Sequence, residues 1–173
     1  MMNLTSVIAI CAMLGAGLAF AAEVPQAGQA APPVSLPAQD GKTVQLSDFP
    51  GKWIVLYFYP KDMTRGCTIE AHNFQRDLAK YTDANALILG VSVDSTASHT
   101  EFCTKESLTF HLLSDPEHKV VDEYGSYRTP PGFAMRNTFL IDPDGKIARV
   151  WTGVDPTHHS EEVLAALAEL QKK

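Results

Sequence analysis

Cys67 stands where a thiol could act as a nucleophile, at the junction of a predicted strand and a predicted helix. Residues 53–59 (WIVLYFY) are β-branched and aromatic and lie between Gly51 and Pro60, which predicts a buried strand. Residues 67–81 then carry apolar side chains at helical spacing. The unpaired N–H groups at a helix N-terminus favour a thiolate, which is the reactive form of cysteine. Cys67 is therefore a candidate nucleophile, with a small buried hydrophobic residue as the alternative interpretation.

Two neighbours extend the candidate site into the pattern P-x-x-x-T-x-x-C, formed by Pro60, Thr64 and Cys67. Thr64 precedes Cys67 by about one helical turn, so its hydroxyl could lie beside the sulfur. Pro60 could close a pocket without adding a backbone N–H donor. Both residues also have structural interpretations, Thr64 as a helix N-cap and Pro60 as the end of a strand, and these roles are compatible with the chemical ones.

The elements around this site predict an α/β domain. Turn residues and apolar patterning indicate a hairpin over 34–46, a second buried strand over 86–93, and a hairpin formed by 138–141 and 146–151. Helices are expected from Ser95 or Thr96 to about Glu106, over a short segment opened by 115–117, and from Ser160 onward. This order predicts a thioredoxin-like fold, with a central mixed β-sheet flanked by helices and an N-terminal β-hairpin.

The motifs together resemble those of the peroxiredoxins, most closely the bacterioferritin-comigratory or Q type. The resemblance includes 34–62 (VSLPAQDGKTVQLSDFPGKWIVLYFYPKD), the motif ending at Cys67, and 138–145 (TFLIDPDG). It implies an antioxidant thiol peroxidase that reduces hydrogen peroxide and organic hydroperoxides without a cofactor. It also implies roles for individual residues: Cys67 as the peroxidatic cysteine, Thr64 and Pro60 in its pocket, Arg136 as the group that holds thiolate and peroxide, and Glu70 as a carboxylate that orients Arg136.

A second thiol is needed if the oxidised cysteine is to be trapped as a disulfide. Many Q-type relatives carry that resolving cysteine five residues after the first, but this chain has His72 there. The family has another arrangement, with the resolving cysteine on the following helix, and Cys103 matches it. The resemblance thus implies a disulfide between Cys67 and Cys103. The alternative is a buried Cys103 in a one-cysteine peroxidase that an external thiol resolves.

The N-terminus predicts export. The first 21 residues carry no charged side chain, and an apolar run over 7–20 ends with small residues near Ala21. This is typical of a signal peptide over 1–21, followed by a flexible lead-in over 22–33 and one peroxiredoxin domain over 34–173. We expect cleavage near Ala21, a periplasmic location and no stable membrane association afterwards. An uncleaved anchor is the alternative, because no Lys or Arg precedes the apolar run.

Composition excludes several other classes of protein. The net charge of −6 gives no basic surface of the kind that nucleic acid requires. The histidines do not have metal-ligand spacing, so no metal site is expected. His72, His99, His111 and His118 are expected at the surface or at helix ends.

Two other functions remain open at this stage. An exported thioredoxin-like disulfide oxidoreductase would need Cys-x-x-Cys, but Thr64 occupies the place of the first cysteine. A redox-responsive binding module would use the same two cysteines, and kinetics alone would separate it from an enzyme. For the peroxidase, the expected partners are a peroxide and a thioredoxin-like or small-thiol reductant, with the chain acting as a monomer.

Overall fold

The computed structural model describes residues 23–172, so the predicted signal peptide lies outside the described residues. A five-stranded sheet runs through the domain in the order β5-β4-β3-β8-β9. Its strands are β3 (Trp53–Phe58), β4 (Ala86–Ser92), β5 (His111–Ser114), β8 (Asn137–Ile141) and β9 (Ile147–Thr152). The β3, β4 and β5 strands are parallel, whereas β8 is antiparallel to both β3 and β9. The predicted mixed sheet is therefore confirmed.

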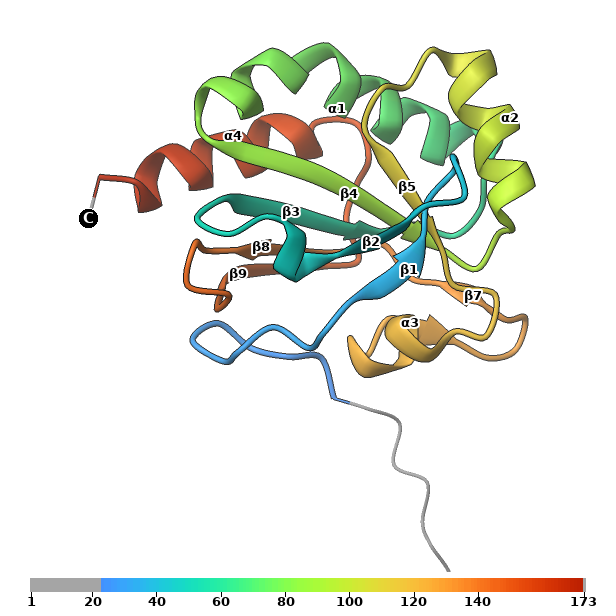
Figure 1. The fold of residues 1–173 in the computed structure, drawn as a ribbon, viewed down its shortest axis with the longest axis horizontal. Coiled ribbons are helices and arrows are strands. Elements are labelled where there is room, and N and C mark those ends of the chain that lie inside the picture. Colours follow the sequence, from blue (N-terminus) through green and yellow to red (C-terminus); the bar gives the residue numbers. More distant parts are fainter. Residues whose placement is uncertain (1–22, 173) are drawn as a thin grey trace, which may run out of the picture.

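Helices cover both faces of this sheet (Figure 1). The helices are α1 (Arg65–Asp83), α2 (Thr96–Glu106), α3 (Lys119–Glu123) and α4 (His159–Leu170). On one face, the apolar core joins side chains of α1, α2 and α4 to those of β3 and β4. On the other face, the core joins α3 to the predicted N-terminal hairpin, formed by β1 (Ser35–Pro37) and β2 (Thr43–Gln45). A 3-10 turn, η1 (Leu46–Asp48), follows the hairpin.

The central strand β3 is buried along almost its whole length. Every residue from Ile54 to Phe58 is at most 4% exposed. A strand with helices on both sides has no solvent-facing side chains, which explains why its sequence is continuously apolar rather than alternating. Burying one such side chain contributes roughly 1.5–3 kcal/mol, so β3 forms a rigid base for the residues that follow it.

Two expectations about local structure need correction. The lead-in is not free of the domain, because Gly28 N donates to Ile147 O at 2.7 Å and Ile147 N donates to Gln29 O at 2.9 Å. β9 is an edge strand whose backbone groups need partners, and this segment supplies them. The helix expected to open at 115–117 begins at Lys119, because the Asp115 carboxylate accepts hydrogen bonds from backbone N–H groups of the helix, including that of Val121 at 2.8 Å.

No element was predicted from the sequence for the segment that precedes β8. A short antiparallel pair, β6 (Tyr127–Arg128) and β7 (Phe133–Ala134), precedes β8. Two-residue strands are too short to show an alternating pattern in the sequence.

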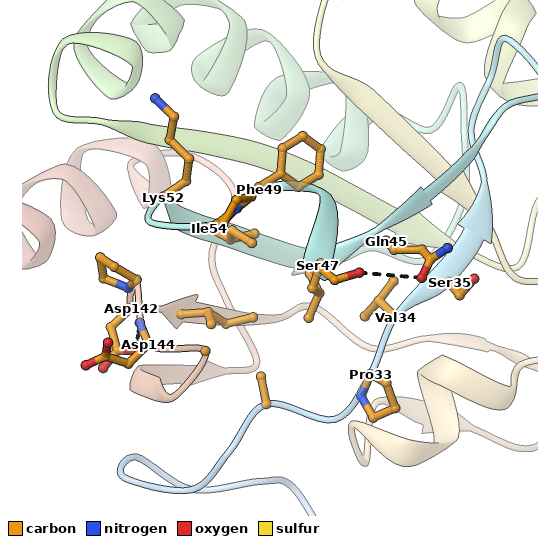
Figure 2. A pocket seen from close by; sticks show the side chains of 16 residues that line it. Pro33, Val34, Ser35, Gln45, Ser47, Phe49, Lys52, Ile54, Asp142 and Asp144 are labelled. Carbon is orange, nitrogen blue, oxygen red and sulfur yellow. Dashed lines mark hydrogen bonds between the residues drawn. The ribbon is translucent and has the colours of Figure 1, made fainter.

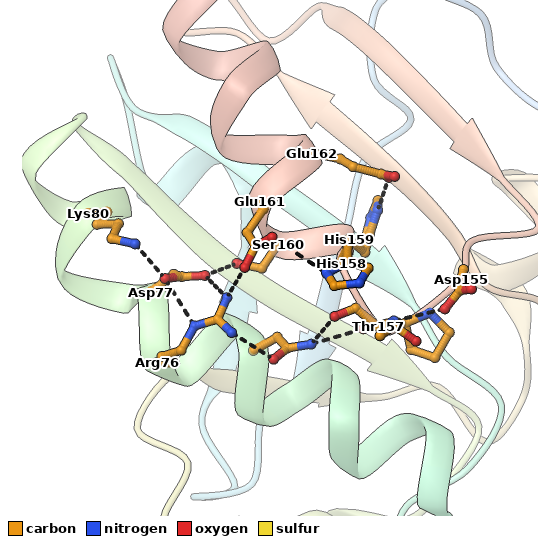
Figure 3. Close-up of polar contacts among 12 residues, drawn as sticks. Arg76, Asp77, Lys80, Asp155, Thr157, His158, His159, Ser160, Glu161 and Glu162 are labelled. Carbon is orange, nitrogen blue, oxygen red and sulfur yellow. Dashed lines mark hydrogen bonds and ion pairs between the residues drawn. The ribbon is translucent and has the colours of Figure 1, made fainter.

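A polar cluster fixes α1 against α4 (Figure 3). The buried carboxylate of Asp77 accepts hydrogen bonds from Arg76 at 2.6 Å, from Lys80 at 2.8 Å and from the Ser160 hydroxyl at 2.9 Å. The expected start of the last helix at Ser160 is displaced by one residue, since α4 begins at His159 and the Ser160 side chain bonds to α1 instead. Hydrogen bonds, that from Arg76 foremost, hold the pKa of Asp77 well below its usual range.

Asp77→Ala is expected to lower the free energy of unfolding by about 2–3 kcal/mol at neutral pH, because it removes the charged acceptor of the buried Ser160 hydroxyl. The depressed pKa means that this stabilisation is present above the unfolded pKa of about 4 and is lost as the pH falls below it. Urea unfolding at pH 7 and at pH 3 measures both effects. A loss below about 0.5 kcal/mol at pH 7, the usual range for a surface substitution, would contradict the assignment.

No helix among residues 23–172 is long and apolar enough to span a membrane.

Candidate active site

The topology of the sheet brings Cys67 and Arg136 together although they are far apart in sequence. Cys67 is the third residue of α1, which follows β3, and Arg136 directly precedes β8. Because β3 and β8 are antiparallel neighbours, with Tyr57 opposite Thr138, the end of β3 lies beside the start of β8. Both residues thus reach the same end of the sheet.

Arg136 contacts the candidate nucleophile directly. Its Nη2 lies 3.2 Å from Cys67 Sγ, and its Nη1 donates to Glu70 Oε2 at 2.5 Å. Cys67 is 2% exposed, and Glu70 is buried one helical turn further along α1. The expected grouping of these three residues is present. A guanidinium keeps its positive charge and directs several N–H donors in one plane, so it can serve both partners at once.

The buried Glu70 that pairs with Arg136 makes the stability of the folded protein depend on pH. Burial raises the pKa of Glu70 to about 7, and the positive charge of Arg136 opposes that rise. Because the folded pKa lies above the unfolded value, the folded protein binds more protons between about pH 4.5 and pH 7, and stability falls as the pH rises through this range. The ionised carboxylate of Glu70, in turn, attracts the guanidinium of Arg136 more strongly than the neutral carboxyl group does.

Gly66 makes room for the guanidinium, a role that sequence reasoning did not identify. A Cβ atom at this position would lie 2.8 Å from Arg136 Nη2, well inside the van der Waals contact distance, so the guanidinium would have to shift. The absence of a side chain at position 66 therefore allows Arg136 to reach Cys67. No pattern in the sequence indicates this, because the two residues meet only after the chain folds.

Gly66→Ala is expected to lower the rate constant for reaction of Cys67 by about 10-fold or more while leaving stability unchanged or raised. Alanine is favoured over glycine in a helix by about 1 kcal/mol, whereas its Cβ would push the end of the Arg136 side chain away from the sulfur. Stopped-flow kinetics and thermal unfolding on one preparation separate the two effects. An unchanged rate would show that the position of the guanidinium does not matter.

Pro60 and Thr64 lie in the loop between β3 and α1. Pro60 is half-buried and lines a hollow of about 560 Å³ together with Arg136, Asn137 and Met135. Thr64 takes the N-cap position of α1, but its hydroxyl donates to the Lys61 carbonyl at 2.9 Å. This hydrogen bond closes the turn that leads into the helix. The position of the hydroxyl beside the sulfur stays a prediction.

Cys103 lies on the inner face of α2, within the same apolar cluster as Cys67. It is 8% exposed, and both cysteines are free thiols. Burial, with a smaller contribution from the charge of Asp62, raises the pKa of Cys103 to about 11. The two thiols therefore differ in environment, because only Cys67 lies against a guanidinium.

Comparison with known proteins identifies the family. Residues 27–150 match the AhpC/TSA family. Peroxiredoxin Bcp of Bacillus subtilis is 41% identical over 152 residues, covering 84% of this chain and 97% of the relative. Peroxiredoxin Bcp of Escherichia coli is 40% identical over 151 residues, covering 83% and 96%. This chain belongs to the AhpC/TSA family and is a peroxiredoxin of the Bcp or Q type. Proteins of this type are thiol peroxidases, so the expected enzyme class is confirmed.

Solved structures agree with this assignment. A cysteine variant of Xylella fastidiosa PrxQ superposes with a TM-score of 0.81 at 33% identity, covering 87% of this chain and 99% of the other. Mycobacterium tuberculosis peroxidoxin BcpB gives a TM-score of 0.79 at 30% identity, covering 84% and 97%. The bacterioferritin comigratory protein of Xanthomonas campestris, studied for alkyl peroxide reduction, gives 0.76 at 34% identity, covering 79% and 91%. The thioredoxin-like fold is confirmed.

A second hollow of the peroxiredoxin lies at the other end of β3 (Figure 2). It is lined by Lys52 and Ile54 at the start of the strand, by Phe49, and by Asp142 and Asp144 in the turn after β8. Neither cysteine lines it. Because Cys67 follows the opposite end of β3, this hollow is separate from the thiol chemistry.

The histidines of the peroxiredoxin differ in burial. His72 is exposed and His118 precedes α3, as expected for surface and helix-end residues. The expectation for His99 is wrong, since it is 0% exposed and its Nδ1 lies 2.8 Å from Asp62 Oδ2. The partner carboxylate, 37 positions away, makes burial of this polar ring possible. Within residues 23–172, no three His, Cys, Asp or Glu side chains gather as a metal site would require.

Proposed function

We propose that Cys67 is the peroxidatic cysteine of this peroxiredoxin and that Cys103 resolves it. The observation that carries the first assignment is the 3.2 Å contact between Arg136 Nη2 and Cys67 Sγ. The thiolate attacks one peroxide oxygen, the O–O bond breaks, and the second oxygen leaves as water or an alcohol after taking up a proton. Cys67 is left as a sulfenic acid.

Arg136 supplies the electrostatic part of this step. Negative charge begins on the sulfur and moves to the leaving oxygen, and a fixed positive donor can stabilise it at both ends. The guanidinium is held in place by Glu70 and is only 17% exposed, so it does not have to reorganise during the reaction. Pro60 and the hollow beside Arg136 leave room for a peroxide with an organic substituent.

Three observations support Cys103 as the resolving residue. It shares an apolar cluster with Cys67, and the position five residues after Cys67 is a histidine, not a cysteine. In Xanthomonas campestris peroxiredoxin Q, two separate cysteine-to-serine variants have been solved, and the substituted cysteines are separated by as many positions as Cys67 and Cys103. A disulfide needs Cα atoms within about 7 Å, so we expect local unwinding of α1 or α2 during turnover.

We further propose that the enzyme is exported, acts as a monomer and is reduced by a thioredoxin-like protein outside the cytoplasm. The uncharged first 21 residues support export to the periplasm, and the resemblance to the Q type supports a monomer. Regeneration by glutathione alone would rule out the protein reductant. Fractionation of the producing cells, with N-terminal sequencing of the recovered chain, tests cleavage near Ala21.

Cys103→Ser is expected to keep the rapid first reaction with peroxide but to lose the second step, formation of the disulfide. Without a resolving thiol, Cys67 remains a sulfenic acid and is open to irreversible over-oxidation. Intact mass after one equivalent of peroxide should show an added oxygen in the variant and the loss of two hydrogens in the wild type. Disulfide formation in the variant as fast as in the wild type would contradict the role of Cys103.

A further inference from the structure

A buried polar network connects the loop that precedes Cys67 to the helix that carries Cys103. Its centre is Asp62, which is 4% exposed. One carboxylate oxygen accepts from the Tyr59 hydroxyl at 2.7 Å, and the other lies 2.7 Å from Ser98 Oγ and 2.8 Å from His99 Nδ1. The backbone N–H of Asp62 donates to Asp94 at 2.9 Å. The reaction described above uses none of these groups.

His99 and Cys103 share the inner face of α2. The buried residues of this helix are His99, Phe102 and Cys103, the i, i+3 and i+4 positions of one stripe. Residues at i and i+4 of a helix are neighbours, with Cβ atoms about 5–6 Å apart, so His99 and Cys103 lie beside each other on this face.

The second nitrogen of this imidazole is free to accept a proton. His99 is completely buried, and its Nε2 has no hydrogen-bond partner within the described part of the chain. Because Nδ1 faces a carboxylate that can only accept, the hydrogen of the neutral ring lies on Nδ1. Nε2 is then an unprotonated base in an apolar cluster, a costly arrangement for a purely structural residue.

The resolving step requires such a base. With the pKa of Cys103 raised to about 11, roughly one thiol in 10⁴ is ionised at pH 7, yet only the thiolate attacks a sulfenic acid. A group that removes this proton inside the cluster would remove most of that barrier.

We propose that His99, oriented by Asp62, accepts the thiol proton of Cys103 and so activates it as the resolving nucleophile. The proposal rests on the assignment of Cys103 made above. The S–H bond of Cys103 breaks and its proton goes to His99 Nε2. The sulfur attacks Cys67 Sγ, the S–S bond forms, and the S–O bond of the sulfenic acid breaks. The leaving hydroxide takes the proton from His99, so the products are one disulfide and one water.

The pH dependence of this step involves a defined set of groups. From the β3–α1 segment, Asp62 and Tyr59 contact His99, and Asp94, two residues after β4, contacts Asp62. Tyr57, Tyr81 and Cys103 are the other titratable side chains in the adjoining core cluster whose pKa values burial raises.

His99→Asn tests the proposal, since an amide can still donate to Asp62 but has no basic nitrogen. Quenched-flow intact mass on the full chain measures two steps, the gain of oxygen and its conversion to the disulfide. At pH 7 we expect conversion to slow by about 10²-fold and the first step to change less than twofold. The difference in the rate of disulfide formation between variant and wild type should shrink as the pH rises, because the thiol then ionises by itself. Asp62→Asn should give a smaller deficit with the same pH dependence.

The matched control is His118→Asn, which removes the imidazole from another His–Asp pair, with Nδ1 2.6 Å from Asp122 Oδ2 on α3. It should leave both steps unchanged. A loss in the rate of disulfide formation for His99→Asn that is equal at every pH would overturn the proposal. No loss at any pH would also overturn it, and would show that opening of α2 alone frees the thiol. If the wild type gains oxygen without forming a disulfide, the assignment of Cys103 fails instead. If His99→Asn does not fold, the rate of disulfide formation in the wild type is measured against pH instead. Base catalysis predicts that this rate reaches a plateau, whereas ionisation of the thiol alone predicts a tenfold rise per pH unit.

Discussion

Cys67→Ser is expected to reduce peroxide turnover by roughly 10⁴-fold or more, to the rate of the uncatalysed reaction. A serine hydroxyl does not ionise near neutral pH and does not form a sulfenic acid, so both the attack and the electron transfer are lost. The fold should be unaffected, because serine is close in size to cysteine and Arg136 retains Glu70 as a partner. Hydrogen peroxide consumption in the presence of a reductant measures the effect.

Cys103 provides an internal control for this result. Cys67→Ser still carries Cys103, a thiol whose pKa burial raises to about 11 and which lies in the same core cluster. If any buried thiol in this cluster could reduce peroxide, the variant would keep activity. Turnover above background in Cys67→Ser, combined with its loss in Cys103→Ser, would reverse the two roles.

Arg136→Met is expected to lower the second-order rate constant with peroxide by about 10²–10³-fold, the typical effect of removing one donor that stabilises developing charge. Methionine fills much of the same volume but cannot donate to Cys67. The variant also leaves Glu70 buried without the guanidinium that pairs with it, so the pKa of Glu70 should rise further and its carboxyl group should stay neutral at pH 7. Stopped-flow kinetics over a range of peroxide concentrations gives the rate constant.

Two further variants identify the cause of that loss. Arg149→Met removes an arginine from an exposed ion pair with Glu169 and should change the rate by less than twofold. The double variant Arg136→Met with Glu70→Gln removes both charges, so it should regain stability without regaining activity. Recovery of activity in the double variant would mean that Arg136 acts by neutralising Glu70 and not on the reacting atoms.

The strands of the sheet were predictable because the apolar residues that indicate their burial are consecutive in the sequence. The strand of β3 is apolar at every position, and the residues that end it and begin α1 are adjacent to it in the sequence. Segments stabilised by distant partners were not predictable. The lead-in gains order only from the edge of β9, and His99 is buried only because Asp62 meets it across 37 positions.

The same division applies to the active site. Cys67, Glu70 and Arg136 were identified from motifs, and the antiparallel pairing of β3 and β8 brings them together as expected. Gly66 could not be assigned, because its role is the absence of a Cβ atom under an arginine that arrives from another strand. The hydrogen bond from the Thr64 hydroxyl to the Lys61 carbonyl was not predicted, because the sequence shows distance along the chain but not the path of the turn.

The central claim is that one thiol attacks peroxide and a second one resolves it. The most direct test mixes the reduced full chain with one equivalent of hydrogen peroxide and quenches it within seconds. Residual peroxide, intact mass and a peptide map are then recorded together. We predict that the peroxide disappears, that the mass falls by two hydrogens, and that the bridge joins Cys67 to Cys103. Persistence of the peroxide with an unchanged mass would contradict the account.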